Sequence, residues 1–163
     1  MKKATSMVIT IREITEENWI QAVKLKVKKE QENFVASNAG SLAESKFRPY
    51  LECYGIYSEG EMIGFSAVGQ SPHNKSVWIV RHMVDAKHQG QGYGKASLKK
   101  VIEYLRDKFS CAEIYLDVTP ENEVATNLYK TAGFKMTDRK VTDKKHGKLP
   151  VYKLDLSKYT EDY

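Results

Sequence analysis

The segment Gln89–Lys95 is the part of the sequence best suited to bind an anion. It reads Gln-Gly-Gln-Gly-Tyr-Gly-Lys and stands between an apolar, strand-like run and an amphipathic, helix-like run. Unpaired backbone N–H groups converge at such a helix start, and glycine lets a phosphate approach them closely. A glycine-rich turn also serves simply to reverse the chain, so the segment alone leaves both interpretations open.

Two common phosphate-binding motifs do not match this segment. A Walker loop begins with glycine and places Ser or Thr after its Gly-Lys, but Gln89 and Ala96 stand at those positions. A dinucleotide-binding fingerprint, Gly-x-Gly-x-x-Gly, matches Gly90 and Gly92, but its third glycine falls on Lys95. A nucleotide-hydrolysing or Rossmann-type protein is therefore not predicted.

The elements that must position this loop follow from hydrophobic periodicity. We predict strands at Met7–Glu13, 54–57, 62–68, Ser76–Val84, Glu113–Val118, Phe134–Val141 and Val151–Leu156. We predict helices after Thr15 as far as Val27, within Asn33–Glu52 after a loop, at Gly94–Phe109 and at Glu121–Ala132. Tight turns at Ser58–Glu61 and at His146-Gly147 predict antiparallel hairpins at both ends of a mixed α and β fold.

Length and composition predict one soluble domain. The chain has 163 residues, of which 41% are hydrophobic and 29% are charged. No apolar run approaches the roughly 18 residues of a membrane span, so we expect a cytoplasmic protein with no membrane contact. Cys53 and Cys111 lack the spacing of zinc ligands, so we predict buried thiols and no metal.

Charge is distributed unevenly along the chain. The net charge is +5, but Glu13–Glu61 holds nine acidic and six basic residues, whereas Lys135–Lys153 holds seven basic and two acidic residues. Basic surface attracts polyanions, either a nucleic acid or a phosphorylated cofactor, and composition does not choose between them. Scattered lysines that only solvate the surface explain the imbalance equally well.

Two motifs in order resemble the GNAT superfamily of acetyl-CoA-dependent N-acetyltransferases. The first, which follows the strand ending Met83-Val84, is Gln89-x-x-Gly92-x-Gly94 and resembles the superfamily's pyrophosphate-binding signature. The second resembles the superfamily's next motif and reads Asn122-x-x-Ala125-x-x-Leu128-Tyr129-x-x-x-Gly133-Phe134. The resemblance implies an α+β fold with a mostly antiparallel, twisted sheet of about seven strands flanked by about four helices. It covers one domain at residues 7–157, with terminal tails at 1–6 and 158–163.

The same resemblance implies an acetyl-CoA site. The residues that it assigns to coenzyme A are His82, Met83, Val84, Gln89, Gly90, Gln91, Gly92, Tyr93, Gly94, Lys95, Asn122 and Tyr129. Backbone groups at the end of the strand would bind the pantetheine arm, and nearby lysines would face the phosphates. Asn122 equally suits an ordinary helix cap.

Acetyl transfer to an amine requires a proton donor for the leaving thiolate and a proton acceptor for the amine. The resemblance assigns the donor role to Tyr129, which also suits a core tyrosine beside Phe134. Some relatives carry a glutamate where this chain has Val80, so the base is open between His82, the remoter Asp117, Glu30 and Glu52, and ordered water.

The acceptor is predicted to be a small molecule with a primary amine, possibly a polyamine such as spermidine. The candidate acceptor residues are Glu30, Glu52, Tyr54, Trp78 and Arg81, and the last two strengthen the resemblance to small bacterial spermidine/spermine acetyltransferases. Peptide and antibiotic amines are alternative acceptors. A basic module that binds nucleic acid, or senses acetyl-CoA without turnover, is the alternative of another class, although no RNA-binding motif is present. The resemblance also implies a homodimer.

Overall fold

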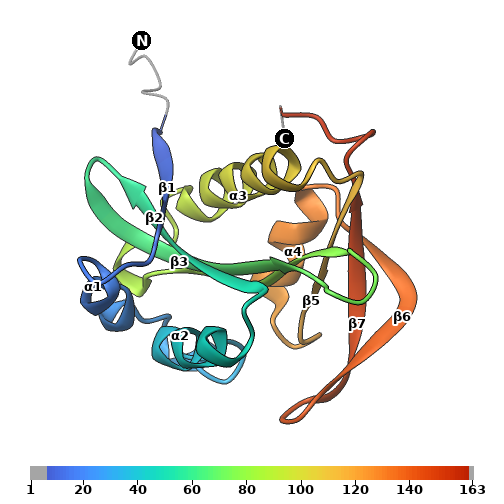
Figure 1. Cartoon of the computed structure of the whole chain (residues 1–163), viewed down its shortest axis with the longest axis horizontal. Helices are drawn as coiled ribbons and strands as arrows, with labels where there is room; N and C mark the ends of the chain where they lie inside the picture. The colour runs from blue at the N-terminus through green and yellow to red at the C-terminus, as the bar shows by residue number, and fades with distance from the viewer. Residues whose placement is uncertain (1–6, 162–163) are drawn as a thin grey trace.

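The computed structural model of the protein describes residues 7–161, which form one sheet with helices on both faces (Figure 1). The strands are β1 (Ile9–Glu13), β2 (Leu51–Ser58), β3 (Glu61–Gln70), β4 (Val77–Val84), β5 (Glu113–Asp117), β6 (Lys135–Asp143) and β7 (Gly147–Asp155). The α-helices are α1 (Trp19–Lys24), α2 (Asn38–Phe47), α3 (Tyr93–Phe109) and α4 (Glu123–Thr131), and two short 3₁₀ helices are η1 (Lys29–Gln31) and η2 (Ala86–His88). Seven strands and four α-helices in this part of the chain confirm the predicted architecture.

The sheet has the strand order β1-β2-β3-β4-β5-β7-β6 and is antiparallel except where β4 meets β5. One core packs α3 and α4 against one face of the sheet and includes Leu98, Ile102 and Phe134. A second core packs α1 and α2 against the other face around Phe65 and Met83. Because both faces of the central strands are covered, β3 is buried along almost its whole length.

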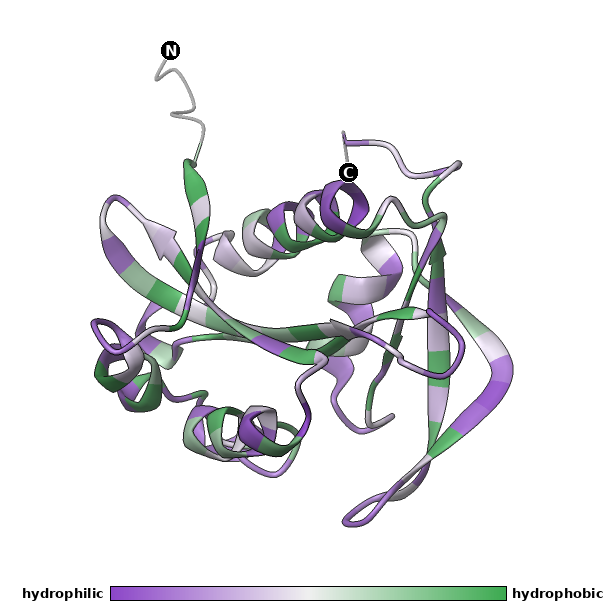
Figure 2. Cartoon of the chain, in the orientation of Figure 1, coloured by the Kyte–Doolittle hydropathy of each residue, from purple (hydrophilic) through white to green (hydrophobic). Residues whose placement is uncertain are grey.

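The helices are amphipathic, so their apolar sides decide which face of the sheet they cover (Figure 2). In α3 the buried side chains are Leu98, Val101, Ile102 and Leu105, at helical spacing, whereas its Lys and Arg residues lie largely outside. Residues 158–161 continue past β7, where the Lys99 ammonium donates to the Glu161 backbone carbonyl. The predicted tail 1–6 lies outside the described residues.

The two predicted hairpins are present, and their strands are longer than predicted. Glu59 and Gly60 both adopt positive φ (50° and 82°) between β2 and β3, as the tightest hairpin turns require. The helix predicted within Asn33–Glu52 ends earlier, at Phe47, because Leu51 and Glu52 already pair with β3 as the start of β2. The first helix also ends early, at Lys24, since Leu25 is extended.

No helix among residues 7–161 is long and apolar enough to cross a membrane.

Candidate active site

The site begins where β4 and β5 separate. Within the described chain these strands pair only at Val77 with Ile114 and at Trp78 with Tyr115. On the other side of β4 the register with β3 shifts, so that Val80 has no partner and bulges outward with 40% of its surface exposed. The backbone of residues 80–84 therefore borders a gap in the sheet, and its residues line two cavities, one at 82–84 and one at 80–82.

The glycine loop follows β4 and leads directly into α3. Gly90 and Gly92 both have positive φ (73° and 90°), and Gly92 caps α3 without a side-chain hydrogen bond. A Cβ at Gly90 would meet nothing within 4 Å, so the backbone there is open to an approaching ligand. The 17-residue helix adds its dipole at this end, which favours a bound anion.

Gln89 ties the glycine loop to its surroundings. Its Nε2 donates to the Val84 carbonyl at 3.0 Å and to Gln31 Oε1 at 2.8 Å. Gln91 Nε2 donates to the carbonyl of Lys87, in the η2 helix directly before the loop, at 2.9 Å. Gln89 thus fixes the loop to the end of β4 and to η1, and Gln91 fixes it to η2.

The first cavity has a volume of about 390 Å³ and lies between the end of β4, the glycine loop and α4. Nine of the residues predicted to bind coenzyme A line it: His82, Met83, Val84, Gln89, Gly90, Gly94, Lys95, Asn122 and Tyr129. Gln91, Gly92 and Tyr93 belong to the same loop but do not line the cavity. Tyr93 instead meets the His88 ring edge-on at 5.8 Å. Valine and leucine side chains make much of the remaining wall.

Tyr129 lies on α4 and lines both cavities. Only 7% of its surface is exposed, and its ring packs edge-on against Phe134 at 5.9 Å. Burial and the nearby negative charge of Asp117 raise the pKa of the Tyr129 phenol above its ordinary value. The hydroxyl is therefore protonated throughout the physiological pH range. The start of α4 is held by Asn122, whose Oδ1 accepts a hydrogen bond from the Ala125 N–H at 3.3 Å.

His82 also lines both cavities. Its Nε2 lies 3.1 Å from Ser97 Oγ, and that hydroxyl donates to the Gly94 carbonyl at 3.1 Å. With the Ser97 proton so used, Nε2 carries the imidazole proton and Nδ1 keeps a lone pair. This Nδ1 atom is buried and has no hydrogen-bond partner among residues 7–161. Burial lowers the pKa of His82 to about 4, so the ring is neutral at pH 7. His82 thus links β4 to the first turn of α3.

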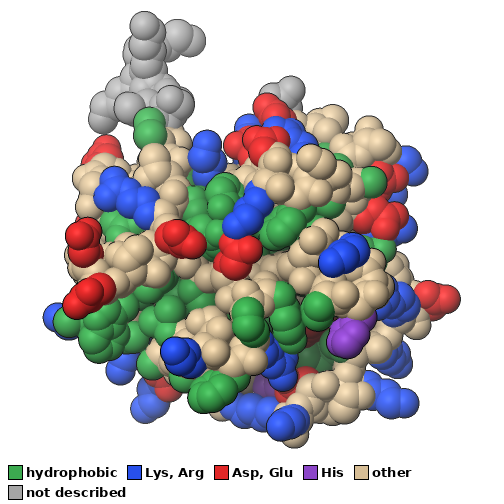
Figure 3. Space-filling view, viewed as in Figure 1, with side chains coloured by type: hydrophobic (Ala, Val, Ile, Leu, Met, Phe, Trp, Pro, Cys, Tyr) green, Lys and Arg blue, Asp and Glu red, His purple; other side chains and the backbone are tan. Residues whose placement is uncertain are grey.

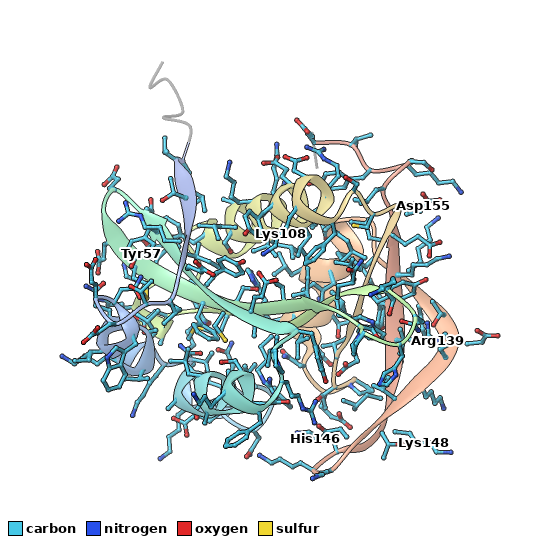
Figure 4. The ribbon with its side chains drawn as sticks, in the orientation of Figure 1. Tyr57, Lys108, Arg139, His146, Lys148 and Asp155 are labelled. Carbon is cyan, nitrogen blue, oxygen red and sulfur yellow. The ribbon has the colours of Figure 1, made fainter. Side chains whose placement is uncertain are left out.

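The second cavity, about 680 Å³, lies beyond Tyr129 and is closed by the β6–β7 turn. Lys145 Nζ donates to Asn33 Oδ1 at 3.0 Å, and His146 Nε2 lies 2.7 Å from the Asn33 carbonyl. Figure 4 shows His146 at this turn, far along the chain from the segment it contacts. These two hydrogen bonds join residues more than 110 positions apart and hold the β6–β7 turn beside Asn33, where both line the cavity.

Charged side chains of both signs line the second cavity. Glu44 pairs with Arg81 at 2.8 Å and with Arg48 at 3.1 Å. Asp117 is exposed as a residue, but its carboxyl group is partly buried. This burial and the negative charge of Asp143 raise the pKa of Asp117. The pKa of Asp143 itself is lowered, because its carboxylate accepts hydrogen bonds from the backbone N–H groups of His146 and Lys145.

The structure does not bring four of the five predicted acceptor residues to either cavity. Glu52 and Tyr54 lie on the face of β2 that meets α3, where both contact Lys108. Trp78 stacks on Tyr115 at 5.4 Å, and Glu30 lies exposed in η1. Their acidic and aromatic character suited a cation site, but β2 turns the first two toward a helix instead. Only Arg81 lines the second cavity.

Sequence reasoning missed Asp143 and Asn33. Asp143 lies in a lysine-rich segment that indicated only an excess of positive charge, and Asn33 lies in a segment without any motif. The length of the β6–β7 hairpin was the one signal that could have indicated that Asp143 reaches the second cavity. No group of three His, Cys, Asp or Glu side chains in residues 7–161 is arranged to hold a metal ion.

The gap between β4 and β5 is thus followed by a glycine loop at the start of α3 and bordered by a tyrosine that stays protonated. A model of the acetyltransferase (GNAT) family matches residues 10–134, and the chain belongs to that family. It is 33% identical over 134 residues to the spermine/spermidine N(1)-acetyltransferase of Bacillus subtilis, a match covering 78% of this chain and 88% of the relative. The protein is an N-acetyltransferase that uses acetyl-CoA as its donor.

Solved structures agree on the fold. A spermidine N-acetyltransferase from Vibrio cholerae in complex with CoA and spermine superposes with a TM-score of 0.73 at 16% identity, over 93% of this chain and 97% of that one. An aminoglycoside acetyltransferase in complex with coenzyme A superposes with a TM-score of 0.75 at 18% identity, over 92% and 96% of the two chains.

Proposed function

We propose that the donor binds along the first cavity, with its phosphates at the glycine loop. Three features support this placement: the start of α3 has no side-chain cap, there is open space at Gly90, and the end of β4 has no partner on the side of β5. Residues 82–84 offer backbone groups to the pantetheine arm, and residues 89–95 offer backbone N–H groups to the phosphates. When bound, acetyl-CoA supplies an activated acetyl thioester at the boundary between the two cavities.

We propose that the acceptor amine enters through the second cavity and meets the thioester beside Tyr129. The observation that carries this proposal is that Tyr129 and His82 line both cavities and so mark where they join. In the reaction the amine nitrogen bonds to the carbonyl carbon and the carbon–sulfur bond breaks. Because Tyr129 is protonated at neutral pH, its hydroxyl donates a hydrogen bond, and finally a proton, to the departing sulfur.

Asp117 is our proposed acceptor of the amine proton. A primary ammonium ion must lose a proton before it can attack, and Asp117 lies in the same cavity wall as Tyr129 with a pKa raised by burial and by the charge of Asp143. His82 suits this role less well, because burial lowers its pKa to about 4 and makes the imidazole a weaker base than a free histidine, whereas burial makes the Asp117 carboxylate a stronger base than a free aspartate. We therefore assign His82 to positioning the glycine loop against β4.

A small molecule with a primary amine is the acceptor class that we propose. The name of the Bacillus subtilis relative supports a polyamine, whereas the second cavity contains both signs of charge and supports a wider set of amines. Peptide and antibiotic amines remain the alternatives. A cytoplasmic homodimer is proposed on the family resemblance alone, and analytical ultracentrifugation with and without CoA would test the dimer.

The experiment is a turnover panel with free-thiol detection and mass spectrometry of the products. Spermidine, spermine, putrescine, aminoglycosides, amino acids and short peptides are each supplied with acetyl-CoA, while calorimetry measures CoA binding separately. We expect one stoichiometric CoA site and one preferred class of amine, acetylated on nitrogen. CoA binding without thiol release on any amine would overturn the proposal in favour of a protein that senses acetyl-CoA.

A further inference from the structure

Five residues of the described chain line both cavities and so form the passage between them: Val35, His82, Asn122, Ala125 and Tyr129. Three of these side chains are polar, and Val35 and Ala125 are aliphatic. None of the five carries a charge at neutral pH, because His82 is neutral there. The charged side chains of the second cavity come from outside this passage, and Figure 3 shows Lys and Arg side chains along the lower edge of the molecule, where the β6–β7 turn lies. The passage therefore suits an uncharged, apolar group.

Ala125 faces the passage from α4. Asn122, Ala125 and Tyr129 are separated by three and four positions, so they lie on one side of the helix. The Asn122 side chain accepts a hydrogen bond from the Ala125 N–H and so fixes the first turn of α4. Ala125 keeps part of its surface exposed, and its single methyl group is the smallest side chain in the passage. A longer side chain at this position would narrow the passage beside Tyr129.

Val35 faces the same passage from the connector at residues 25–37, between the helices α1 and α2 on the other face of the sheet. Hydrogen bonds hold the connector on both sides of Val35. The Asn33 carbonyl lies 2.7 Å from His146 Nε2, and Ser37 caps α2 by accepting from the Gly40 N–H at 3.0 Å. Because its β-branched side chain has few rotamers, Val35 forms a stiff wall opposite α4.

We propose that Val35 and Ala125 set the length of the acyl chain that the enzyme transfers, and that they leave room for a propionyl group as well as an acetyl group. This inference rests on the proposed function, in which the thioester lies where the two cavities join. The amine reaches the thioester carbonyl there, so the acyl chain lies in the passage, against its two aliphatic side chains.

The reaction of a propionyl thioester is the same as that of an acetyl thioester. The amine nitrogen bonds to the carbonyl carbon and loses one proton, the carbon–sulfur bond breaks, and the sulfur takes up one proton as the thiol of CoA. The two donors differ only by one methylene group. Burying that group against Val35 and Ala125 is favourable, because it removes apolar surface from water.

Three acyl-CoA donors that differ by single methylene groups test the proposal. Acetyl-CoA, propionyl-CoA and butyryl-CoA are each supplied with the best amine of the turnover panel, with free-thiol detection and mass spectrometry of the product. We expect kcat/KM for propionyl-CoA to lie within about tenfold of the acetyl-CoA value, and kcat/KM for butyryl-CoA to be at least about tenfold below the propionyl-CoA value.

Two variants change the passage in opposite directions. Ala125→Val adds two methyl groups and should lower the propionyl-to-acetyl ratio of kcat/KM at least about tenfold. Val35→Ala removes two methyl groups and should raise the butyryl-to-acetyl ratio about tenfold. Calorimetry should show an unchanged affinity for free CoA in both variants, because free CoA carries no acyl group. A merely structural defect would lower the values for all three donors together.

Val124→Ala is the matched control. Val124 neighbours Ala125 on α4 and lines the first cavity but not the second, with 70% of its surface exposed. The variant removes the same two methyl groups as Val35→Ala, but from outside the passage. It should change the values for the three donors by one common factor and leave both ratios unchanged. Thermal melting of each variant shows whether the fold is intact, and Val35 belongs to neither core.

The outcomes separate this inference from the proposed function. A propionyl-CoA value more than tenfold below the acetyl-CoA value, or equal values for butyryl-CoA and propionyl-CoA, would overturn the inference and leave the acetyltransferase proposal standing. Unchanged donor ratios in Ala125→Val or Val35→Ala, or an equal change in Val124→Ala, would also overturn it. If Ala125→Val does not fold, the wild-type ratios and Val35→Ala decide the question. Absence of thiol release from all three donors on every amine, despite CoA binding, would contradict both.

Discussion

The two cavities are lined by different kinds of chemical group. The first is walled largely by apolar side chains and by backbone at β4 and the glycine loop, and three short stretches of sequence supply most of its lining. The second is lined by six separate segments, and four of them supply charged side chains, among them α2, β4 and the β6–β7 turn. In the arrangement that we propose, backbone groups bind the shared donor, whereas side chains bind the acceptor, which differs between members of the family.

The same difference appears in how each cavity is held in place. Gln89 and the Ser97–His82 contact fix the glycine loop through bonds between residues close to β4 and α3. The second cavity depends on hydrogen bonds to Asn33 from Lys145 and His146, two residues of the exposed β6–β7 turn. We therefore expect substitutions in the first region to affect every acceptor alike, and those in the second to change which acceptor is used.

Tyr129→Phe should have the largest effect, because Tyr129 belongs to both regions. The change removes one hydroxyl and keeps the ring that packs on Phe134, so the fold should be retained. We expect kcat to fall about 100-fold or more for every acceptor, as the loss of a proton donor requires, with CoA affinity unchanged. Steady-state kinetics and calorimetry measure the two quantities. A kcat within threefold of wild type would remove Tyr129 from the mechanism.

Gly92→Ala should weaken donor binding by about tenfold for every acceptor. Alanine is strained by about 1–2 kcal/mol at a left-handed φ, and the loop relaxes away from the geometry that presents its N–H groups. Gly60→Ala is the control, since Gly60 has a similar φ of 82° and open space in the distant β2–β3 turn. Both variants should lose similar stability, and only the first should lose CoA affinity by calorimetry. Equal affinities in the two variants would place the phosphates elsewhere.

Most residues predicted to bind the cofactor lie together in the structure because the determinants of the first region are local. A strand, a glycine loop and a helix are adjacent in sequence, so nine of the twelve residues predicted for the cofactor line one cavity. The second region was predicted poorly because no local pattern reports which segments meet. Glu52 and Tyr54 have the right chemistry for a cation site, but strand alternation turns them toward α3. Asp143 reaches the site only through the length of the β6–β7 hairpin.

Asp143→Asn should change the pH dependence and leave the fold intact. Asparagine keeps the oxygen that accepts from the Lys145 and His146 N–H groups but removes the negative charge. That charge helps to raise the pKa of Asp117, while Arg81 opposes it, so the variant lowers that pKa. The acid limb of kcat, where Asp117 becomes protonated, should then move to lower pH and increase activity there a few-fold at most. An acid limb that stays in place would exclude Asp117 as the base.

Glu52→Gln should have the smallest effect on catalysis, and it decides between the sequence-based and structure-based acceptor sites. The Glu52 carboxylate accepts hydrogen bonds from Tyr54 and from Lys108, and Tyr104 donates to the Tyr54 hydroxyl at 2.9 Å. This cluster joins β2 to α3, away from both cavities. Losing the charge should cost about 1 kcal/mol of stability, or a few degrees in Tm, because the pair is partly exposed.

The KM of each amine should stay within about twofold in Glu52→Gln, whatever its charge. Lys108→Met, which removes the other partner of the same ion pair, should lower Tm similarly and also leave the KM values unchanged. A tenfold rise in KM for spermidine that is absent for a monoamine would mean that Glu52 binds a second ammonium group. Because Glu52 lines neither cavity, that result would require the acceptor to extend beyond the second cavity to the β2–α3 face. The acceptor site would then not be confined to the second cavity.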